Sequence, residues 1–433
     1  MLKRTLSLLL VCLMLLPMLA SVGMAEETVE IRFVWWGDTK RHEVYNAVCD
    51  EFEAVNPGIK VVRESNNWND YWTKLATQVA GGNGPEVMGM HPQYVSDYAG
   101  RGALADLQPF MDSGIIRTQD IPEAVLRGGS VNGLMCMVSQ GITFGNLIIN
   151  KTLADELGIE MPGMTDDWTW DEFAEKAAQT REKALELGMD DVYFSNDQCN
   201  YNAFRYPVRQ AGSDLYVDGK LGYDAAMVAD YMQYWKNFRD ADIGPDAATN
   251  TEDGTLPLEE KMFTRGKTIV MGVPVNQLWL YQAQMEGINI VPVRTPTGNN
   301  GERGEYLEGA HVAASASASP EKLEAAAKFI DFFVNEEAAL KHLKMEQGVP
   351  ANTKMAEFIK PLLDEPNQKA IDYVTLTTPV AFASTYAPVG ASAIDGEFRT
   401  AAEEVAFGSK TPEQAAEDFI ARANEILAQN AAQ

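Results

Sequence analysis

The sequence predicts an α/β protein in which mostly parallel sheets are covered by helices. Short segments rich in β-branched and aromatic residues alternate with longer segments of helical apolar spacing. Turn residues such as Asn56-Pro57-Gly58 separate these segments. The chain has 433 residues, more than one hydrophobic core usually supports, so two or more domains are expected.

The first five predicted elements show the alternation most clearly. They are a strand over 30–36 (E-I-R-F-V-W-W), a helix through 44–55, a strand over 59–63, a helix over 71–80 and a strand over 86–90. A βαβαβ order predicts parallel strands joined by crossover helices. Ligands of such sheets gather at the carboxyl ends of the strands.

The later elements continue this pattern, and the last third is mostly helical. Thr169 and Glu172 form a capping box before a helix that runs to about Leu187. Ser319-Pro320 and Thr411-Pro412 each place a cap residue before a proline at the first helical position. Further strands are predicted over 134–139, 146–150, 268–272 and 289–293, and further helices over 225–241 and 412–429. Because no repeat or low-complexity linker separates the domains, they are expected to be interleaved.

The first 25 residues have the features of a secretory signal peptide. Lys3 and Arg4 precede an apolar run over 6–20, and Gly23-Met24-Ala25 places small residues before a cleavage site. The alternative is an N-terminal membrane anchor, but the run is short for a span of about 20 residues. Leu9-Leu10-Val11 before Cys12 do not form a lipobox, so we expect a released, periplasmic or extracellular product.

The charge is strongly acidic, with 35 basic and 62 acidic residues and a net charge of −27. Loss of Lys3 and Arg4 with the signal peptide takes the net charge to −29. Such a chain would be repelled by a phosphate backbone, so nucleic-acid binding is not expected.

Motifs for metal, cofactor or catalytic chemistry are sparse. The sequence lacks H-E-x-x-H and G-x-S-x-G, and its four histidines have no ligand spacing. The segment 214–219 (D-L-Y-V-D-G) is better explained as a turn than as a calcium loop. Cys49, Cys136 and Cys199 form no C-x-x-C pair and are expected to be packed free thiols. We therefore expect no metal, no cofactor and no catalytic residue.

Aromatic residues beside polar ones in loops stand out instead. A sugar ring has an apolar face, which an aromatic ring matches, and a belt of hydroxyls, which Asp, Asn, Gln, Arg and His match. Packing explains any single one of these aromatic residues about as well as binding does, although the position of Trp36 at the end of the first strand favours binding. The cases are 35–38 (W-W-G-D), 66–72 (N-N-W-N-D-Y-W), 168–170 (W-T-W), Tyr201, Phe204, Trp279 and Tyr281.

A set of segments in order along the chain resembles family 1 extracellular solute-binding proteins of ABC importers, the maltose-binding-protein-like group. The early segments are 31–42 (I-R-F-V-W-W-G-D-T-K-R-H), 52–61 (F-E-A-V-N-P-G-I-K-V) and 68–88 (W-N-D-Y-W-T-K-L-A-T-Q-V-A-G-G-N-G-P-E-V-M). The later ones are 147–151 (L-I-I-N-K), 166–173 (D-D-W-T-W-D-E-F), 266–271 (G-K-T-I-V-M) and 327–335 (A-K-F-I-D-F-F-V-N). The resemblance covers essentially the whole mature chain.

This resemblance implies a two-lobed periplasmic-binding-protein fold of type II-like topology, with a hinge between the lobes and the ligand cleft at their interface. By analogy, lobe one would be 26–139 plus 292–345, and lobe two 140–291 plus 346–433. The implied function is a non-enzymatic, monomeric receptor that captures a carbohydrate and delivers it to an ABC permease, its only link to the membrane. The implied ligand contacts are Trp36, Asp38, Arg41, His42, Trp68, Gln93, Tyr94, Thr143, Tyr201, Asn276 and His311, with Trp36 and Tyr201 stacking on the sugar.

The opening W-W-G-x-x-x-R-H is closest to oligogalacturonide- and oligosaccharide-binding members. Arg41 and His42 would then meet a uronate carboxylate, although a surface pair at the start of a helix is an equal alternative. Two departures leave the sugar open: Gly141-Ile142-Thr143 stands where similar sequences have G-V-N, and Gly309-Ala310-His311 where many have G-G-W. His311 would take an aromatic contact position.

Two other functions remain open at this point. Spatially paired carboxylates would make the protein a secreted polysaccharide hydrolase or lyase, and with 62 acidic residues the sequence does not exclude such a pair. Alternatively, the same fold would bind a solute other than a sugar, such as a peptide or a phosphonate.

Overall fold

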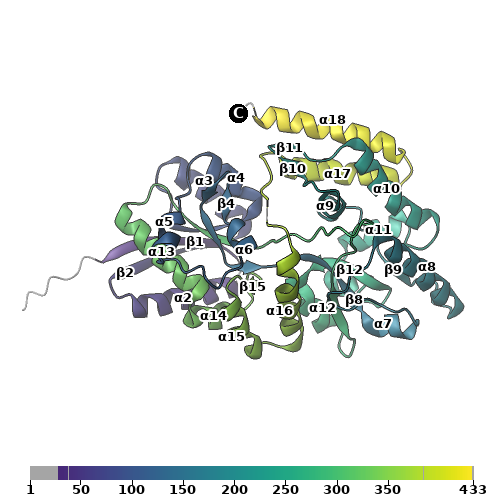
Figure 1. Cartoon of the computed structure of the whole chain (residues 1–433), viewed down its shortest axis with the longest axis horizontal. Helices are drawn as coiled ribbons and strands as arrows, with labels where there is room; N and C mark the ends of the chain where they lie inside the picture. Colours follow the sequence, from purple (N-terminus) through teal and green to yellow (C-terminus); the bar gives the residue numbers. More distant parts are fainter. Residues whose placement is uncertain (1–27, 38, 384, 432–433) are drawn as a thin grey trace, which may run out of the picture.

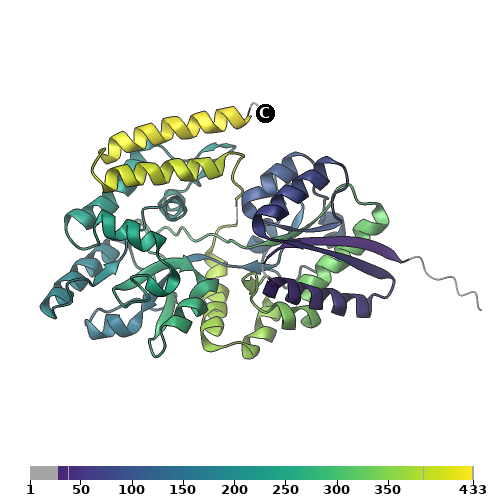
Figure 2. The ribbon, with the colours of Figure 1, turned by 180° about the vertical axis from the view of Figure 1, so that it is seen from behind.

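The computed structural model of the protein describes residues 28–37, 39–383 and 385–431. The predicted signal peptide lies outside these residues. Two bodies lie side by side, each built on its own sheet with helices around it, and Figure 2 shows the same arrangement from behind (Figures 1 and 2). This is the two-lobed α/β fold expected from the family resemblance.

In the described part of the chain, the first lobe contains a five-stranded sheet in the order β2-β1-β3-β14-β6. Its strands are β1 (Val29–Trp36), β2 (Ile59–Asn66), β3 (Val87–Met90), β6 (Met137–Ser139) and β14 (His311–Ala314). β1 pairs in parallel with β2 and β3, whereas β14 pairs antiparallel with β3 and β6. The predicted parallel sheet is therefore present with one reversed strand, which enters from the other lobe.

The second lobe contains, among the described residues, a four-stranded sheet in the order β13-β8-β12-β9. Its strands are β8 (Gly145–Asn150), β9 (Tyr193–Ser195), β12 (Thr268–Pro274) and β13 (Ile290–Val293). β12 is parallel to β9, while β8 runs antiparallel to both β12 and β13. Here too the reversed strand is the first one reached after the chain crosses between the lobes.

Both faces of β1 are buried, which explains its nearly continuous apolar sequence. Phe33 and Trp35 point into the core that contains α2 (Thr39–Val55) and α13 (Pro320–Asn335). Val34 and Trp36 point to the opposite face, where they pack with residues of α3 (Trp68–Ala80). The alternation fixes Trp36 on the α3 face, at the carboxyl end of the strand.

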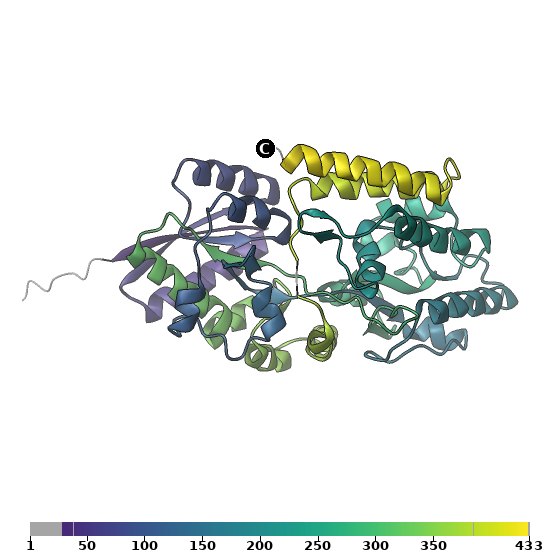
Figure 3. The same ribbon diagram turned by 45° about the horizontal axis from the view of Figure 1, so that its top comes forward.

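Helices surround both sheets. α2, α3, α4 (Pro92–Gly100), α13 and α14 (Glu337–Leu343) belong to the first lobe. The second lobe contains α7 (Lys151–Glu156), α8 (Trp170–Glu186), α9 (Tyr201–Gln210), α10 (Ala225–Asp240), α11 (Ala247–Thr255) and α12 (Leu278–Gln284). α17 (Ala391–Ala406) and α18 (Pro412–Ala431) pack against α10 and lie along one side of this lobe (yellow in Figure 3). The remaining elements are α5 (Gln108–Asp112), α6 (Glu123–Arg127), α15 (Thr353–Ile359), α16 (Glu365–Thr377), β4 (Ser130–Val131), β5 (Leu134–Met135), β7 (Gly141–Ile142), β10 (Tyr216–Val217), β11 (Lys220–Leu221) and β15 (Val349–Pro350).

The local signals in the sequence fix several element ends. Thr169 and Glu172 make the reciprocal hydrogen bonds of a capping box at the start of α8. Ser319 is the N-cap of α13, and Pro320 is the first residue of that helix. The prediction of a single strand over 134–139 is wrong, because the structure divides this segment into β5 and β6. β5 pairs with β4 in a hairpin, whereas β6 pairs with β14.

Two smaller expectations are also confirmed. Cys49, Cys136 and Cys199 are free thiols, and burial raises the pKa of Cys49 to about 12. The segment 214–219 belongs to a hairpin, with Asp218 and Gly219 at positive φ between β10 and β11. This is ordinary two-residue turn chemistry.

The division of the chain between the lobes remains a proposal at its C-terminal boundary. Buried side chains of α15 and α16 join the core around β1 and α13, although the boundary proposed at 346 would assign them to lobe two. α16 also contacts α12 and β13 of the second lobe. The segment 349–380 is therefore best placed between the lobes, and the lobe-two tail begins near α17.

Three stretches connect the lobes, namely 140–144, 294–310 and, among the described residues, 378–383 with 385–390. Where the first two meet each other and the turn before β15, glycines allow backbone to lie against backbone. A Cβ on Gly309, whose φ is +149°, would lie 2.0 Å from the carbonyl oxygen of Gly141. A Cβ on Gly348, whose φ is +108°, would lie 2.6 Å from that of Ile142. These positions require glycine for both conformation and space.

We predict that Gly309→Ala destabilises the protein by about 2 kcal/mol or more, because it combines a strained φ with a collision between backbone atoms. Gly396→Ala is the matched control. Gly396 lies inside α17 with nothing within 4 Å of an added Cβ, so alanine there should stabilise by about 0.5–1 kcal/mol. Denaturant unfolding of the two variants measures both effects. An unchanged midpoint for Gly309→Ala would show that the crossing tolerates a side chain.

Candidate ligand-binding cleft

An aromatic cluster lies at the carboxyl ends of β1 and β3 in the first lobe. The ring centroids of Trp36 and Trp68 are 5.3 Å apart in an edge-to-face arrangement, and Tyr94 lies 5.7 Å from Trp68. Trp72 stacks on Tyr94 at 4.0 Å with an interplanar angle of 17°. His91 contacts Trp36 and Trp68 at 6.1 and 5.2 Å. The structure thus brings together three of the predicted site residues, Trp36, Trp68 and Tyr94.

Local sequence explains how these rings are positioned. Trp36 is the last residue of β1, and Trp68 is the first residue of α3, whose N-cap Asn67 accepts a hydrogen bond from the Asp70 backbone N–H. His91 directly follows β3. Trp36 is 8% exposed, so it forms the floor of the cluster, while Trp68 is only partly buried.

A cavity of about 1030 Å³ lies between the lobes beside this cluster. Its walls come from the first lobe, from α9 and the β10 hairpin of the second lobe, from the 294–310 crossing, and from the chain around the start of α17. The lining residues are His91, Pro92, Tyr201, Asn202, Arg205, Leu215, Tyr216, Leu307, Glu308, Thr385, Ala387, Ala391 and Asp395.

The charged wall of the cavity is organised around Arg205. Its guanidinium lies 4.4 Å from the ring centre of Tyr306, and its Nε is 3.7 Å from Asp214 Oδ1. Arg209 donates to Asp214 Oδ2 at 2.6 Å from the buried side of the same helix. Burial raises the pKa of Glu308, against the opposing charge of Arg205. Cation and carboxylates are therefore balanced here rather than segregated.

Tyr201 is the predicted site residue that lies in the wall of the cavity. It is 4% exposed, and its hydroxyl donates to Tyr216 at 3.1 Å and lies 2.8 Å from the Tyr223 hydroxyl. Phe398 packs against its ring at 5.3 Å. Because the rings of Trp36 and Tyr201 are both packed against protein, their predicted stacking on a sugar stays a prediction.

Other predicted residues occupy the hinge side of the cleft. Thr143 Oγ1 donates to Asn276 Oδ1 at 2.9 Å, and the Thr143 backbone exchanges two hydrogen bonds with that of Glu308. His311 is buried at the start of β14, with its ring 6.4 Å from that of Tyr386. The backbone of Thr143 therefore ties two crossing segments together, and its side chain ties one of them to Asn276 of the second lobe.

Arg41 and His42 are engaged inside the protein. Arg41 Nε donates to Glu346 Oε1 at 2.8 Å, and its Nη1 donates to the Trp36 carbonyl at 3.2 Å. His42 Nδ1 accepts a hydrogen bond from Trp35 Nε1 at 3.1 Å. These contacts favour a structural role over the suggested uronate contact. Asp38 lies outside the described residues, as does the side chain of Gln93.

Sequence reasoning missed several residues of the cavity wall, among them Arg205, Tyr216 and His91. Arg205 is four residues after Tyr201 and so shares its face of α9, which is a signal that helical spacing provides. His91 directly follows a predicted strand, at the end where ligands gather. Tyr216 reaches the site only through the hairpin fold, which no local pattern shows.

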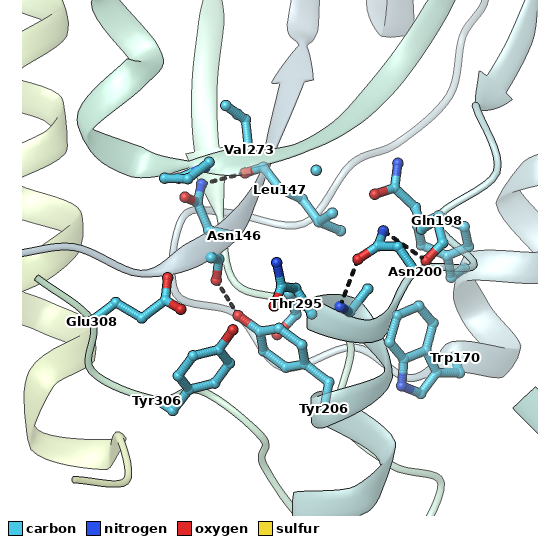
Figure 4. Close-up of a pocket in the computed structure, with 16 residues that line it drawn as sticks. Asn146, Leu147, Trp170, Gln198, Asn200, Tyr206, Val273, Thr295, Tyr306 and Glu308 are labelled. Carbon is cyan, nitrogen blue, oxygen red and sulfur yellow. Dashed lines mark hydrogen bonds between the residues drawn. The ribbon is translucent and has the colours of Figure 1, made fainter. Parts of the chain in front are cut away.

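A second cavity, of about 820 Å³, lies within the second lobe between α8, α9 and the adjoining ends of β8 and β12. Figure 4 shows Tyr206, Tyr306 and Glu308 on one side of it and Gln198, Asn200 and Trp170 on the other. It shares Asn202 and Glu308 with the cavity between the lobes. The two cavities are therefore neighbours that meet at these residues.

Within the described residues, no group of three or more His, Cys, Asp or Glu side chains is arranged to hold a metal ion. The site that remains is a concave region with aromatic and hydrogen-bonding side chains, divided between two lobes. Such a site is suited to binding a polar organic molecule.

A family model described as bacterial extracellular solute-binding protein matches residues 47–378. The chain belongs to this family. A protein from Brucella abortus that is named only as a binding protein is 23% identical over 395 residues, which cover 88% of this chain and 89% of that protein.

Solved structures show the same fold over almost the whole solute-binding protein. A family 1 extracellular solute-binding protein from Alicyclobacillus acidocaldarius has a TM-score of 0.80 and 25% identity, covering 92% of this chain and 98% of its own. A periplasmic oligogalacturonide binding protein from Yersinia enterocolitica has a TM-score of 0.79 and 20% identity, covering 93% and 100%. An ABC substrate-binding protein from Listeria monocytogenes in complex with cycloalternan has a TM-score of 0.71 and 21% identity, covering 93% and 99%.

No helix in the described part of this solute-binding protein combines the length and apolar character needed to cross a membrane.

We predict that both histidines of the cleft region are neutral at pH 6–8. Burial lowers the pKa of His91 to about 4, and burial together with the charge of His91 lowers that of His311 to about 4. Both pKa values lie below the unfolded value of about 6.5. These histidines therefore contribute stability that is present above about pH 6.5 and is lost as the pH falls towards 4.

NMR titration of the labelled imidazoles, with His91→Gln and His311→Gln used for assignment, should give midpoints near 4. A midpoint above 6 for either ring would show that the ring is solvated or paired with a carboxylate.

Proposed function

We propose that this protein is an exported receptor that captures a neutral carbohydrate between its two lobes and delivers it to an ABC-type permease, without catalysing a reaction. The cavity between the lobes is the observation that carries the proposal. It draws its walls from both lobes, so a ligand held there would favour the closed arrangement over the open one. Family membership supports the role of a receptor.

The chemistry of the walls supports a sugar as the ligand. Beside the cavity, Trp68 and Tyr94 offer partly buried rings, and Trp68 contacts the lining residue His91. In the lining itself, Asn202, Thr385 and Tyr216 offer hydrogen-bonding groups. Similar solved structures include an oligogalacturonide binding protein and a protein in complex with cycloalternan. An apolar ring face and a belt of hydroxyls would be matched together.

The charges support a neutral sugar rather than a uronic one. Arg205 is the cation in the lining, and it faces Glu308 in the same cavity, with Asp395 also in the wall. Arg41, the cation suggested for a uronate, is ion-paired with Glu346. An acidic ligand would therefore meet no excess of positive charge, in a chain with a net charge of −27.

The same proposal includes the export of the protein and its binding to a permease. Residues 1–25 would be removed after Ala25 on export, and Leu9-Leu10-Val11 before Cys12 do not form a lipobox, which agrees with a released protein. The receptor would act as a monomer. The permease would bind the closed form, in which both lobes present one continuous surface.

Thermal-shift and calorimetric screening across neutral and uronic mono- and oligosaccharides tests the function. We expect a neutral sugar to stabilise the protein by about 2.7 kcal/mol at 100 times its Kd, with no product detectable by chromatography. Stabilisation by uronic sugars alone would overturn the preference for a neutral ligand. Release of shorter products would favour the hydrolase or lyase alternative.

A second prediction concerns Trp68 in the aromatic cluster of the first lobe, which lies beside the cavity. Trp68→Ala should lower the affinity for that sugar about tenfold, because a ring that stacks on a sugar loses its partner. Trp279→Ala is the matched control, since Trp279 is 44% exposed on α12 of the second lobe and does not belong to the aromatic cluster beside the cavity. Equal affinities for the wild type and Trp68→Ala, measured by calorimetry, would remove Trp68 from the site.

A further inference from the structure

The cavity inside the second lobe has its own walls and is distinct from the cavity between the lobes. It lies between α8, α9 and the strand ends at Gly145 and Pro274, and residues of the first lobe do not line it. Its volume of about 820 Å³ is close to the 1030 Å³ of the cavity between the lobes. Glu308 and Asn202 belong to both walls, so a ligand could extend from one space into the other.

Two buried polar atoms in its lining are without a hydrogen-bond partner among the described residues, namely Asn146 Oδ1 and Thr295 Oγ1. Asn146 is 2% and Thr295 is 6% exposed. A buried polar atom normally has a partner, because leaving it unpaired opposes folding. The amide oxygen is an acceptor and the hydroxyl both accepts and donates, so both would be satisfied by a ligand that carries hydroxyl groups.

The lining also contains the polar residues Gln198, Asn200 and Asn202, and it has an apolar and aromatic side. Trp170 is held in place by its Nε1, which donates to Gln210 Oε1 at 3.1 Å, and Phe173 packs 5.6 Å from it. Leu147 and Val273 complete an apolar side. A rigid aromatic group opposite unsatisfied acceptors matches a sugar ring, which has one apolar face and a hydroxyl edge.

Charge in this cavity comes from a single carboxyl group. Glu308 is the acidic residue in the lining, and no Lys, Arg or His lines it among the described residues. Burial raises the pKa of Glu308, and the charge of Arg205 opposes this shift. An anionic group would meet no cation within the cavity itself.

We propose that this cavity is a subsite for the neutral terminal ring of an oligosaccharide whose remaining rings lie between the lobes. The ligand is thus at least a disaccharide, and it passes Glu308 and Asn202 where the two cavities meet. This inference rests on the proposed function, because it assigns one end of the same ligand.

Thr295→Val tests the subsite, because valine has the same shape but lacks the hydroxyl. It should lower the affinity for cellobiose, maltose, cellotriose or maltotriose, whichever binds the wild type, about tenfold. At the same time it should raise the melting temperature of the ligand-free protein, since an unpaired buried hydroxyl is removed. A purely structural role for Thr295 would give the opposite sign for stability.

Ala203→Phe and Ala391→Phe form a matched pair of filling variants. Ala203 lines the cavity of the second lobe and Ala391 the cavity between the lobes. We expect each variant to weaken calorimetric binding of the same sugars at least tenfold, with ligand-free melting temperatures as the check on folding.

The outcomes separate the two proposals. If Ala391→Phe weakens binding while Ala203→Phe and Thr295→Val bind like the wild type, the subsite is overturned and the proposed function stands. If none of the three variants changes the affinity, the ligand binds elsewhere and both proposals fall. Both also fall if none of the four sugars binds the wild type.

Discussion

The close approach of three backbones at the hinge is the constraint on which the rest of this structure depends. Gly141 and Gly309 in two crossing segments, and Gly348 in the turn before β15, let these backbones lie against one another where a Cβ would collide with a carbonyl oxygen. The Thr143 and Glu308 backbones then exchange two hydrogen bonds across the same point. This junction positions Leu307 and Glu308 in the cavity wall, so the hinge and the binding site share one segment of chain.

The two sides of the cleft differ in chemistry, because one is aromatic and the other is polar and charged. In the first lobe, Trp68 packs edge to face against both Trp36 and Trp72, whose rings are tilted by 33° to each other, and the three rings make a stiff platform at the ends of β1 and β3. In the second lobe, Asp214 holds Arg209 and accepts a hydrogen bond from Thr385, and Arg205 lies beside it over Tyr306. A platform of rings and a balanced polar wall would meet only when the lobes close.

The sequence predicts the parts of this protein that local chemistry determines. The β1-to-β3 alternation, the Thr169 capping box and the proline-started α13 follow from spacing and caps alone. Among candidate site residues, Trp36, Trp68 and Tyr94 gather because they follow or adjoin strand ends. What local chemistry does not encode is pairing over distance. The reversed strand β14 depends on a chain returning from the other lobe, and the ion pair of Arg41 joins residues 305 positions apart.

A ligand divided between the two cavities, as proposed, would have a consequence for closure. A ligand shifts an equilibrium between open and closed lobes only by as much as it binds the two forms differently. A ring held by Thr295 and Trp170 contacts groups of one lobe and the crossing segment, so it would add affinity to both forms alike. The rings beside His91 contact both lobes and would carry the difference. On this argument the inner subsite would retain the proposed ligand, the outer cavity would make the permease sensitive to its presence, and a single ring in the inner subsite would bind without closing the protein.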